Sequence, residues 1–347
     1  MAFFQRRIKP SSPPVDLAAI SADNPHLQQP QGDGTEHYVT LFDANFLPQG
    51  LCLYYSLVRH GGDFVLWVLC IDRECLDILQ RINLPRLRLL DLEQLESPEL
   101  LAVKSYRSRG EYCWTLTPFS IRYVFEADNT AQRVTYVDSD IFFLRSPQDV
   151  IAKFIYSQKA VLLTPADFAP HYDQSESSGY YCVQFMIFSR GRSEIVRKWW
   201  EDRCLEWCFA RAEAGKMGDQ KYLDFFPILF SQLVYSLDQT GCFLAPWNAI
   251  SYPFSSAVAF HFHGLRIYGP SRMVLLFTHY DIPLPTIDYV YRRYLSMLAA
   301  IELEYLINLP TQGRHPVGFA NFLAHGISRI LHFRAYPGHL NRLFGRL

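Results

Sequence analysis

The chain has 347 residues, of which 49% are hydrophobic and 15% aromatic, so it can bury the core of one large domain or of two small ones. Its formal net charge of −1 gives no electrostatic argument for nucleic-acid binding. No apolar run reaches the ~18 residues that a membrane-spanning helix requires. The eight cysteines are scattered and no signal peptide precedes them, so we expect a cytoplasmic protein without a disulfide framework. Cys204 and Cys208 stand at helical spacing, but no second pair matches them, which argues against a structural zinc site.

Residues 1–35 contain five prolines among polar residues and show no hydrophobic periodicity, and we expect them to form a disordered arm. After this arm, apolar runs of strand type alternate with segments of helical periodicity. The strand-type runs are residues 37–42, 64–71 and 86–91, and the helical segments between them are residues 51–58 and 73–82. Such alternation predicts an α/β domain with a mostly parallel sheet and right-handed crossovers, which we expect to span residues 36–285.

A further strand is predicted at the start of residues 133–144, which read RVTYVDSDIFFL. Asp138 and Asp140 interrupt its apolar pattern, although burying unpaired carboxylates is costly. Ligands bind at the carboxyl ends of strands in an open α/β sheet, and there an Asp-x-Asp suits a divalent cation that bridges the oxygens of a diphosphate. A solvated turn is the alternative interpretation of these two residues taken alone.

Four polar residues elsewhere are candidates for contacts with a substrate. Arg122 lies in a predicted helix, where it is either a surface arginine or a bidentate partner for a diphosphate. Gln184 interrupts an apolar strand, where it either satisfies backbone groups or touches a substrate. Asp219 and Gln220 follow Gly218, and Asp219 can cap the helix that comes next.

The segment at residues 260–264, FHFHG, places two histidines next to aromatic residues. In an extended segment His261 and His263 share one face. Two imidazoles on one face could supply nitrogen ligands to a metal that carboxylates already hold. Paired packing histidines are the alternative.

In their order along the chain, these segments resemble a bacterial group of glycosyltransferases related to glycosyltransferase family 8, which has the GT-A fold of the nucleotide-diphospho-sugar transferase superfamily. The likeness runs from residue 37 to residue 280, and its parts are DAN after the first strand, the arginine helix, YVDSD, YCVQFMIF, the helix with WW and CLEWC, GDQKYLD, LAPWN and HFHG. It implies a metal-dependent glycosyltransferase of hexosyltransferase type. Such an enzyme moves a sugar from a UDP- or GDP-sugar to a glycan, lipid or other acceptor, with retention of configuration. The cation is commonly Mn2+, with Mg2+ as the alternative.

The resemblance also implies roles for individual residues. Asp138 and Asp140 would bind the metal and the nucleotide ribose, and His261 would be the third metal ligand. Asp43 and Asn45 would face the nucleoside, Arg122 the phosphates, and Asp219 and Gln220 the sugar. From their residue types and positions we add His263 as a candidate metal ligand, Arg266 as a candidate donor-binding cation and Gln184, with Asp219 and Gln220, as a candidate catalytic residue. The chain departs from the family pattern twice. Ile267-Tyr268-Gly269 stands where the family has Lys-Pro-Trp, so that Arg266 is the cation nearby, and Cys182 replaces an asparagine.

Residues 286–347 are expected to form a helical, basic extension, which could lie on an anionic membrane surface, cap the domain or bind a partner. Two alternatives to a transferase are open at this point. A phosphatase of the haloacid dehalogenase type also carries Asp-x-Asp after an apolar strand, but normally near the start of the chain and with Thr or Val where Phe142 stands here. A non-catalytic protein that binds sugar nucleotides would keep donor affinity without turnover.

Overall fold

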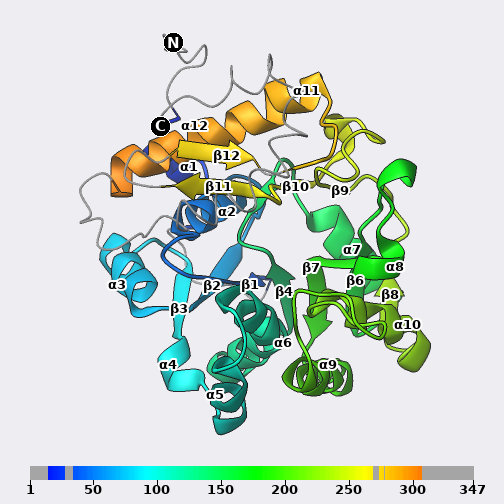
Figure 1. Cartoon of the computed structure of the whole chain (residues 1–347). Coiled ribbons are helices and arrows are strands. Elements are labelled where there is room, and N and C mark those ends of the chain that lie inside the picture. The colour runs from blue at the N-terminus through cyan, green and yellow to red at the C-terminus, as the bar shows by residue number, and fades with distance from the viewer. Residues whose placement is uncertain (1–14, 28–33, 269–272, 277, 307–347) are drawn as a thin grey trace, which may run out of the picture.

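The structure is a computed structural model that describes residues 15–27, 34–268, 273–276 and 278–306. Its centre is a seven-stranded sheet in the order β3-β2-β1-β4-β7-β6-β8 (Figure 1). The strands are β1 (Glu36–Phe42), β2 (Phe64–Cys70), β3 (Leu87–Asp91), β4 (Arg133–Val137), β6 (Val161–Pro165), β7 (Tyr181–Ser189) and β8 (Val234–Ser236). Strand β7 runs antiparallel to both of its neighbours, and the other neighbouring pairs are parallel. The predicted α/β class with a mostly parallel sheet is therefore confirmed.

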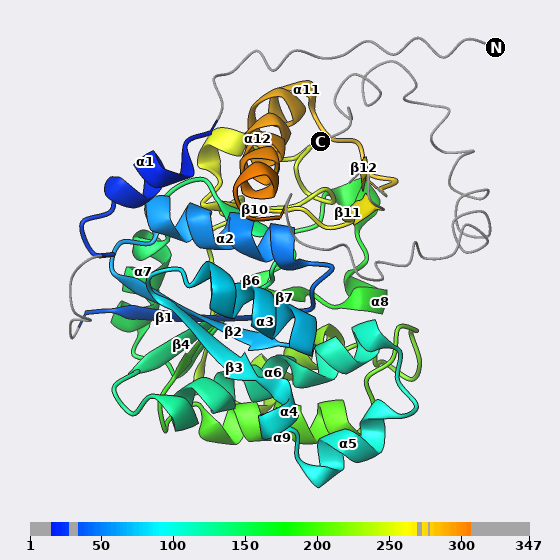
Figure 2. The same ribbon diagram turned by 90° about the vertical axis from the view of Figure 1, so that its left-hand side faces the viewer.

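Helices cover both faces of this sheet (Figure 2). One face carries α2 (Leu47–His60), α3 (Arg73–Ile82) and α7 (Gln148–Ser157), and the other carries α5 (Pro98–Lys104), α6 (Arg109–Ala127) and α9 (Glu194–Glu206). Strand β2 is apolar throughout because its side chains alternate between the two resulting cores. Leu66 and Val68 pack in the first core, whereas Val65 and Trp67 pack in the second.

A smaller layer packs over α2, on the first face of the main sheet (Figure 2). It contains the three-stranded sheet β5 (Ile141–Phe143), β10 (Ala259–His261) and β9 (Phe243–Leu244), the hairpin β11 (Leu265–Tyr268) and β12 (Met273–Leu276), and helix α12 (Arg292–Ile301). The remaining helices are α1 (Leu17–Ala22), α4 (Leu92–Leu95), α8 (Ser175–Ser178), α10 (Phe226–Leu229) and α11 (Leu284–Thr286). Short 3-10 turns span Pro170–Tyr172, Gln220–Phe225 and Phe254–Ser256, and π-helical turns span Ile287–Tyr291 and Glu302–Leu306.

The expectation of a disordered arm is wrong for residues 15–27. Helix α1 packs on α2, with Leu17 and Ile20 buried, and the side chain of Asn24 donates to the carbonyl of Val58 at 2.7 Å. The apolar pair is only two residues in a short helix, so no periodicity is visible in the sequence. Residues 1–14 and 28–33 of the expected arm lie outside the described residues.

The expected carboxy-terminal extension also begins inside the packed domain. Met297 and Leu298 of α12 are buried in the first core, and Figure 2 shows this helix beside α2. Residues 307–347, which carry the basic end considered for membrane contact, lie outside the described residues. Among the helices that the structure does describe, none is both long enough and apolar enough to cross a membrane.

Candidate metal and donor site

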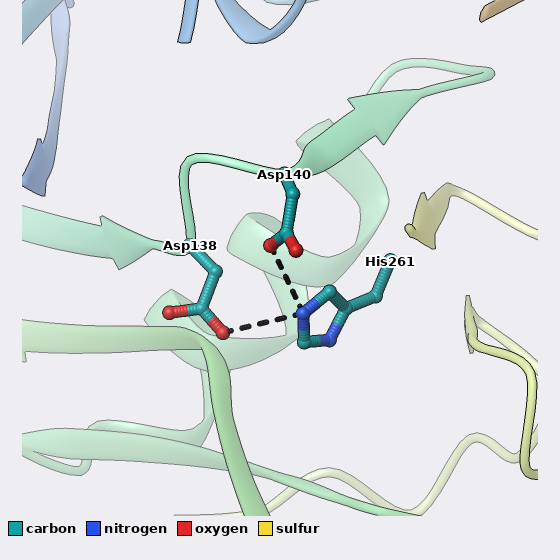
Figure 3. A group of neighbouring side chains, drawn as sticks. All are labelled: Asp138, Asp140 and His261. Atoms are coloured by element: carbon teal, nitrogen blue, oxygen red, sulfur yellow. Dashed lines mark ion pairs between the residues drawn. The ribbon is translucent and has the colours of Figure 1, made fainter. Parts of the chain in front are cut away.

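Two strand pairings bring three potential metal ligands together. Asp138 follows β4 directly and Asp140 precedes β5, so the Asp-Ser-Asp turn joins the main sheet to the small one. Strand β10 pairs antiparallel with β5 and sets His261 opposite Ile141. This register carries the imidazole to the turn, where Nε2 of His261 lies 3.0 Å from Oδ1 of Asp140 and 3.7 Å from Oδ2 of Asp138 (Figure 3). The ligand atoms of the three residues all lie within 4.8 Å of one another.

The charges in this group interact strongly because Asp140 and His261 are buried and Asp138 is half-buried beside them. Burial raises the pKa of Asp138 to about 6, with the attraction of His261 opposing the shift and the charge of Asp140 adding to it. Burial would also raise the pKa of Asp140, but His261 lowers it well below its usual range. Burial disfavours the imidazolium form of His261, yet Asp140 raises its pKa well above the usual value. The histidine proton thus occupies a place between two carboxylates where a cation could replace it.

Two neighbours orient these ligands. Nδ1 of His261 lies 3.2 Å from Oε1 of Gln184 on β7, and because an amide oxygen only accepts, Nδ1 carries a proton and Nε2 faces the carboxylates. The hydroxyl of Tyr136 donates to Oδ1 of Asp138 at 3.0 Å, which leaves Oδ2 toward the histidine. Cys182 is also buried beside His261, and burial raises the pKa of its thiol. Gln184 therefore contacts a ligand residue in this structure, whereas Tyr136 was missed because its pattern is that of a core strand.

Asp219 lies close enough to Asp138 for their charges to interact, and its backbone carbonyl accepts from the indole of Trp200 on α9 at 2.9 Å. Its side chain is 3% exposed, and its Oδ2 has no hydrogen-bond partner in the described part of the protein. Burial raises the pKa of this carboxyl to about 7, and the charge of Asp138 contributes to the shift. The neighbouring Gln220 donates from Nε2 to the carbonyl of Ser178 at 2.9 Å.

The carboxyl end of β1 holds a second polar group. Asp43 accepts from the backbone N–H of Asn45 at 2.9 Å and from that of Phe46 at 3.2 Å. Its Oδ2 lies 2.6 Å from Nε of Arg109, whose guanidinium also pairs with Asp72 beyond the end of β2. Arg109 is the first residue of α6. The sequence indicates this helix start through the capping box that Ser108 and Glu111 form.

Arg122 does not lie at this site. It stands near the far end of α6, where Nη1 is 3.4 Å from Glu201 and Nε is 3.5 Å from Glu126, and its guanidinium packs over the ring of Phe119. The structure does not bring Arg122 to a diphosphate site, because α6 spans Arg109–Ala127 and its first residue, rather than Arg122, lies beside Asp43. Pro118 inside the helix conceals this length in the sequence.

The last two predicted residues flank the metal group. His263 is exposed, with its ring 5.7 Å from that of His261 and 5.5 Å from that of Trp247, and it stands outside the group of three ligands. Arg266 on β11 packs its guanidinium 5.0 Å from the centre of the Phe46 ring. After His261, its charge is among those that lower the pKa of Asp140, so Arg266 lies close enough to influence the metal group.

The sheet order and the small second layer are those of the GT-A glycosyltransferase fold. The galactosyltransferase LgtC, solved with donor and acceptor sugar analogs, matches 80% of this chain over 99% of its own length, with a TM-score of 0.50 and 14% sequence identity. No protein-family model matches the chain.

Relatives by sequence come from Bacillus subtilis (strain 168). The uncharacterized protein YfnF is 30% identical over 253 residues, which cover 67% of this chain and 82% of YfnF. The uncharacterized protein YfnD is 28% identical over 222 residues, which cover 63% of this chain and 70% of YfnD. The chain belongs to the family of YfnF.

Proposed function

We propose that the chain is a metal-dependent glycosyltransferase of hexosyltransferase type, which moves a sugar from a UDP- or GDP-sugar to a glycan, lipid or other acceptor with retention of configuration. The observation that carries the proposal is the convergence of Asp138, Asp140 and His261 at the carboxyl end of a parallel strand in a GT-A fold. A cytoplasmic location, with peripheral contact at the inner membrane face, belongs to the same proposal.

The donor set of this group suits a divalent cation. Two carboxylates provide hard oxygen ligands, and the oriented Nε2 of His261 provides one nitrogen. Mn2+ accepts oxygen and imidazole ligands together, whereas Mg2+ prefers oxygen alone. When bound by Asp138, Asp140 and His261, the cation would neutralise charge on the departing diphosphate.

The chain itself offers further groups for the donor. Arg266 supports the proposal because its positive charge lowers the pKa of Asp140. It directly precedes residue 267, where the family that the chain resembles has a lysine. At the end of β1, Asp43, Asn45 and Arg109 present both acceptors and donors, which is what recognition of a nucleoside edge requires. We assign the nucleoside to these three residues.

On the sugar side, Asp219 offers a carboxyl whose pKa of about 7 lets it accept or donate a hydrogen bond near neutral pH. Its Oδ2 is buried and has no hydrogen-bond partner in the described part of the protein, and we assign this atom to a sugar hydroxyl. Since Nε2 of Gln220 is bonded to Ser178, its amide oxygen is the atom left for the sugar. We propose that these two side chains orient the transferred sugar.

The proposal is tested by calorimetry with UDP and with GDP, each in Mn2+ and in excess chelator. Binding of one nucleotide should require the metal, because the two carboxylates otherwise repel the diphosphate. Asp140→Asn should abolish the metal dependence. Asp149→Asn, which removes an exposed carboxylate from the first turn of α7, is the matched control. Equal affinity in metal and in chelator would refute the proposed site.

Turnover separates an enzyme from a non-catalytic sugar-nucleotide-binding protein. A panel of UDP- and GDP-sugars with Mn2+ should reveal slow hydrolysis of one donor, in which water replaces the acceptor. Metal-dependent nucleotide binding without hydrolysis or transfer to any acceptor would favour the binding protein. The phosphatase alternative is not supported by the fold, which is of the GT-A type.

A further inference from the structure

A cavity of about 480 Å³ opens at the opposite end of the main sheet from the metal group. Arg133, the first residue of β4, lines it, whereas Asp138 follows the last residue of that strand. The 5 residues of β4, at about 3.3 Å each, separate the two places by roughly 17 Å. The cavity therefore shares no residue with the proposed donor site.

Three cationic side chains line this cavity, namely Arg133, Lys159 and Arg192. Among the described residues of its lining there is no aspartate or glutamate. Glu36, which lies outside the lining, pairs with Arg133 through both carboxylate oxygens, with Nε at 2.8 Å from one of them. One of the three charges is thus neutralised by a carboxylate.

In the described part of the protein, the side chains of the other two cations, Lys159 and Arg192, donate to neutral carbonyl groups. Nζ of Lys159 donates to the carbonyl oxygens of Ser231 and Gln232, at 3.3 and 3.2 Å. Nη2 of Arg192 donates to the carbonyl of Gln158, at the end of α7, at 2.8 Å. These carbonyls fix the side chains in place but carry no net charge, so the cavity keeps a positive potential that favours an anion.

The rest of the lining fits a ligand larger than an inorganic ion. The side chains of Gln132 and Gln158 are exposed and offer amide groups, and Ile155 is 52% exposed on the same rim. An exposed aliphatic side chain beside amides suits the C–H face and the hydroxyls of a sugar ring. We propose that this cavity binds a phosphorylated sugar, with the phosphate between Lys159 and Arg192 and the ring against Ile155.

The test is calorimetry at low ionic strength in chelator, so that no divalent cation is present at the donor site. Glucose 1-phosphate, inorganic phosphate and glucose are the probes. Glucose 1-phosphate should bind with saturation and more tightly than inorganic phosphate, and glucose should not bind. Replacing both cations, Lys159→Gln with Arg192→Gln, should weaken binding at least about tenfold, because two charge-assisted contacts are lost.

Three further variants guard against indirect effects. Gln132→Glu leaves both cations and their carbonyl contacts in place but adds a negative charge at the rim, and should also weaken binding. Lys198→Gln with Arg293→Gln removes the same total charge from exposed sites elsewhere and should leave the affinity within about twofold. Asp140→Asn should have no effect, which separates this proposal from the proposed enzyme activity.

Absence of saturable binding to the unmodified protein would overturn the proposal, as would equal affinity of the Lys159/Arg192 variant. Equal losses in the Lys159/Arg192 and Lys198/Arg293 variants would also overturn it, because the effect would then follow net charge alone. If inorganic phosphate binds as tightly as glucose 1-phosphate, the assignment of a sugar is wrong.

Discussion

Gln184 and His261 meet in the buried space between β7 and β10, with Oε1 of the amide 3.2 Å from Nδ1 of the ring. The amide oxygen fixes the imidazole tautomer, and Nε2 is thereby directed at Asp138 and Asp140. Gln184 is thus a positioning residue for a ligand of the proposed metal site.

Replacing Gln184 by Leu should lower the affinity for Mn2+ about 10–100-fold, because the imidazole loses the acceptor that holds its tautomer and orientation. Gln184→Glu retains an acceptor at the same place and should restore most of the affinity. Manganese titration followed by calorimetry measures both variants. Loss of affinity in both alike would indicate a purely structural effect and contradict this prediction.

Arg109→Gln should weaken metal-dependent binding of the nucleotide by about tenfold. The substitution removes the guanidinium that pairs with Asp43 at the end of β1, where we assign the nucleoside. Arg122→Gln should leave this affinity unchanged, because its guanidinium contacts Glu201 and Glu126 instead. Both changes remove one charge from α6, which makes them a matched pair. A larger loss of affinity from Arg122→Gln than from Arg109→Gln would mean that Arg122, and not Arg109, contacts the nucleotide.

The thermal stability of the metal-free protein should fall as the pH rises from roughly 5 to roughly 8. The pKa of Asp219 is about 7 in the folded chain and about 3.9 when unfolded, so between these values the folded state binds more protons and loses stability with rising pH. The raised pKa of Asp138, about 6, acts in the same direction. The melting temperature of Asp219→Asn, measured in chelator across this range, should depend less steeply on pH; an unchanged slope would show that Asp219 is not the titrating group.

Leu17→Ala should lower the free energy of unfolding by about 2–4 kcal/mol, as expected for a buried leucine that leaves a cavity. Leu17 lies in the first core although it precedes the main domain in sequence. Chemical denaturation measures the change. Ala18→Ser on the exposed side of α1 is the control and should alter stability little; a negligible effect of Leu17→Ala would mean that α1 does not contribute to the core.

Local patterns were sufficient for much of the fold. The alternation of apolar strands with helical segments predicts the parallel part of the sheet that contains β1, β2 and β3, and the continuous apolar runs of β1 and β2 match their burial on both faces. The apolar run that ends in Asp138 likewise places the Asp-Ser-Asp turn at the carboxyl end of a strand. These features depend on burial and on neighbours in sequence, and both can be read from the residues themselves.

Only the tertiary structure decided which distant side chains meet. The antiparallel register of β10 on β5 brings His261 to Asp140, and the start of α6 at Arg109 puts that arginine, rather than Arg122, beside Asp43. The burial of α1 also depends on a surface that α2 provides. Each outcome is set by the pairing of elements far apart in the chain, and the free energy of such pairings comes from packing and exclusion of water, which no single segment encodes.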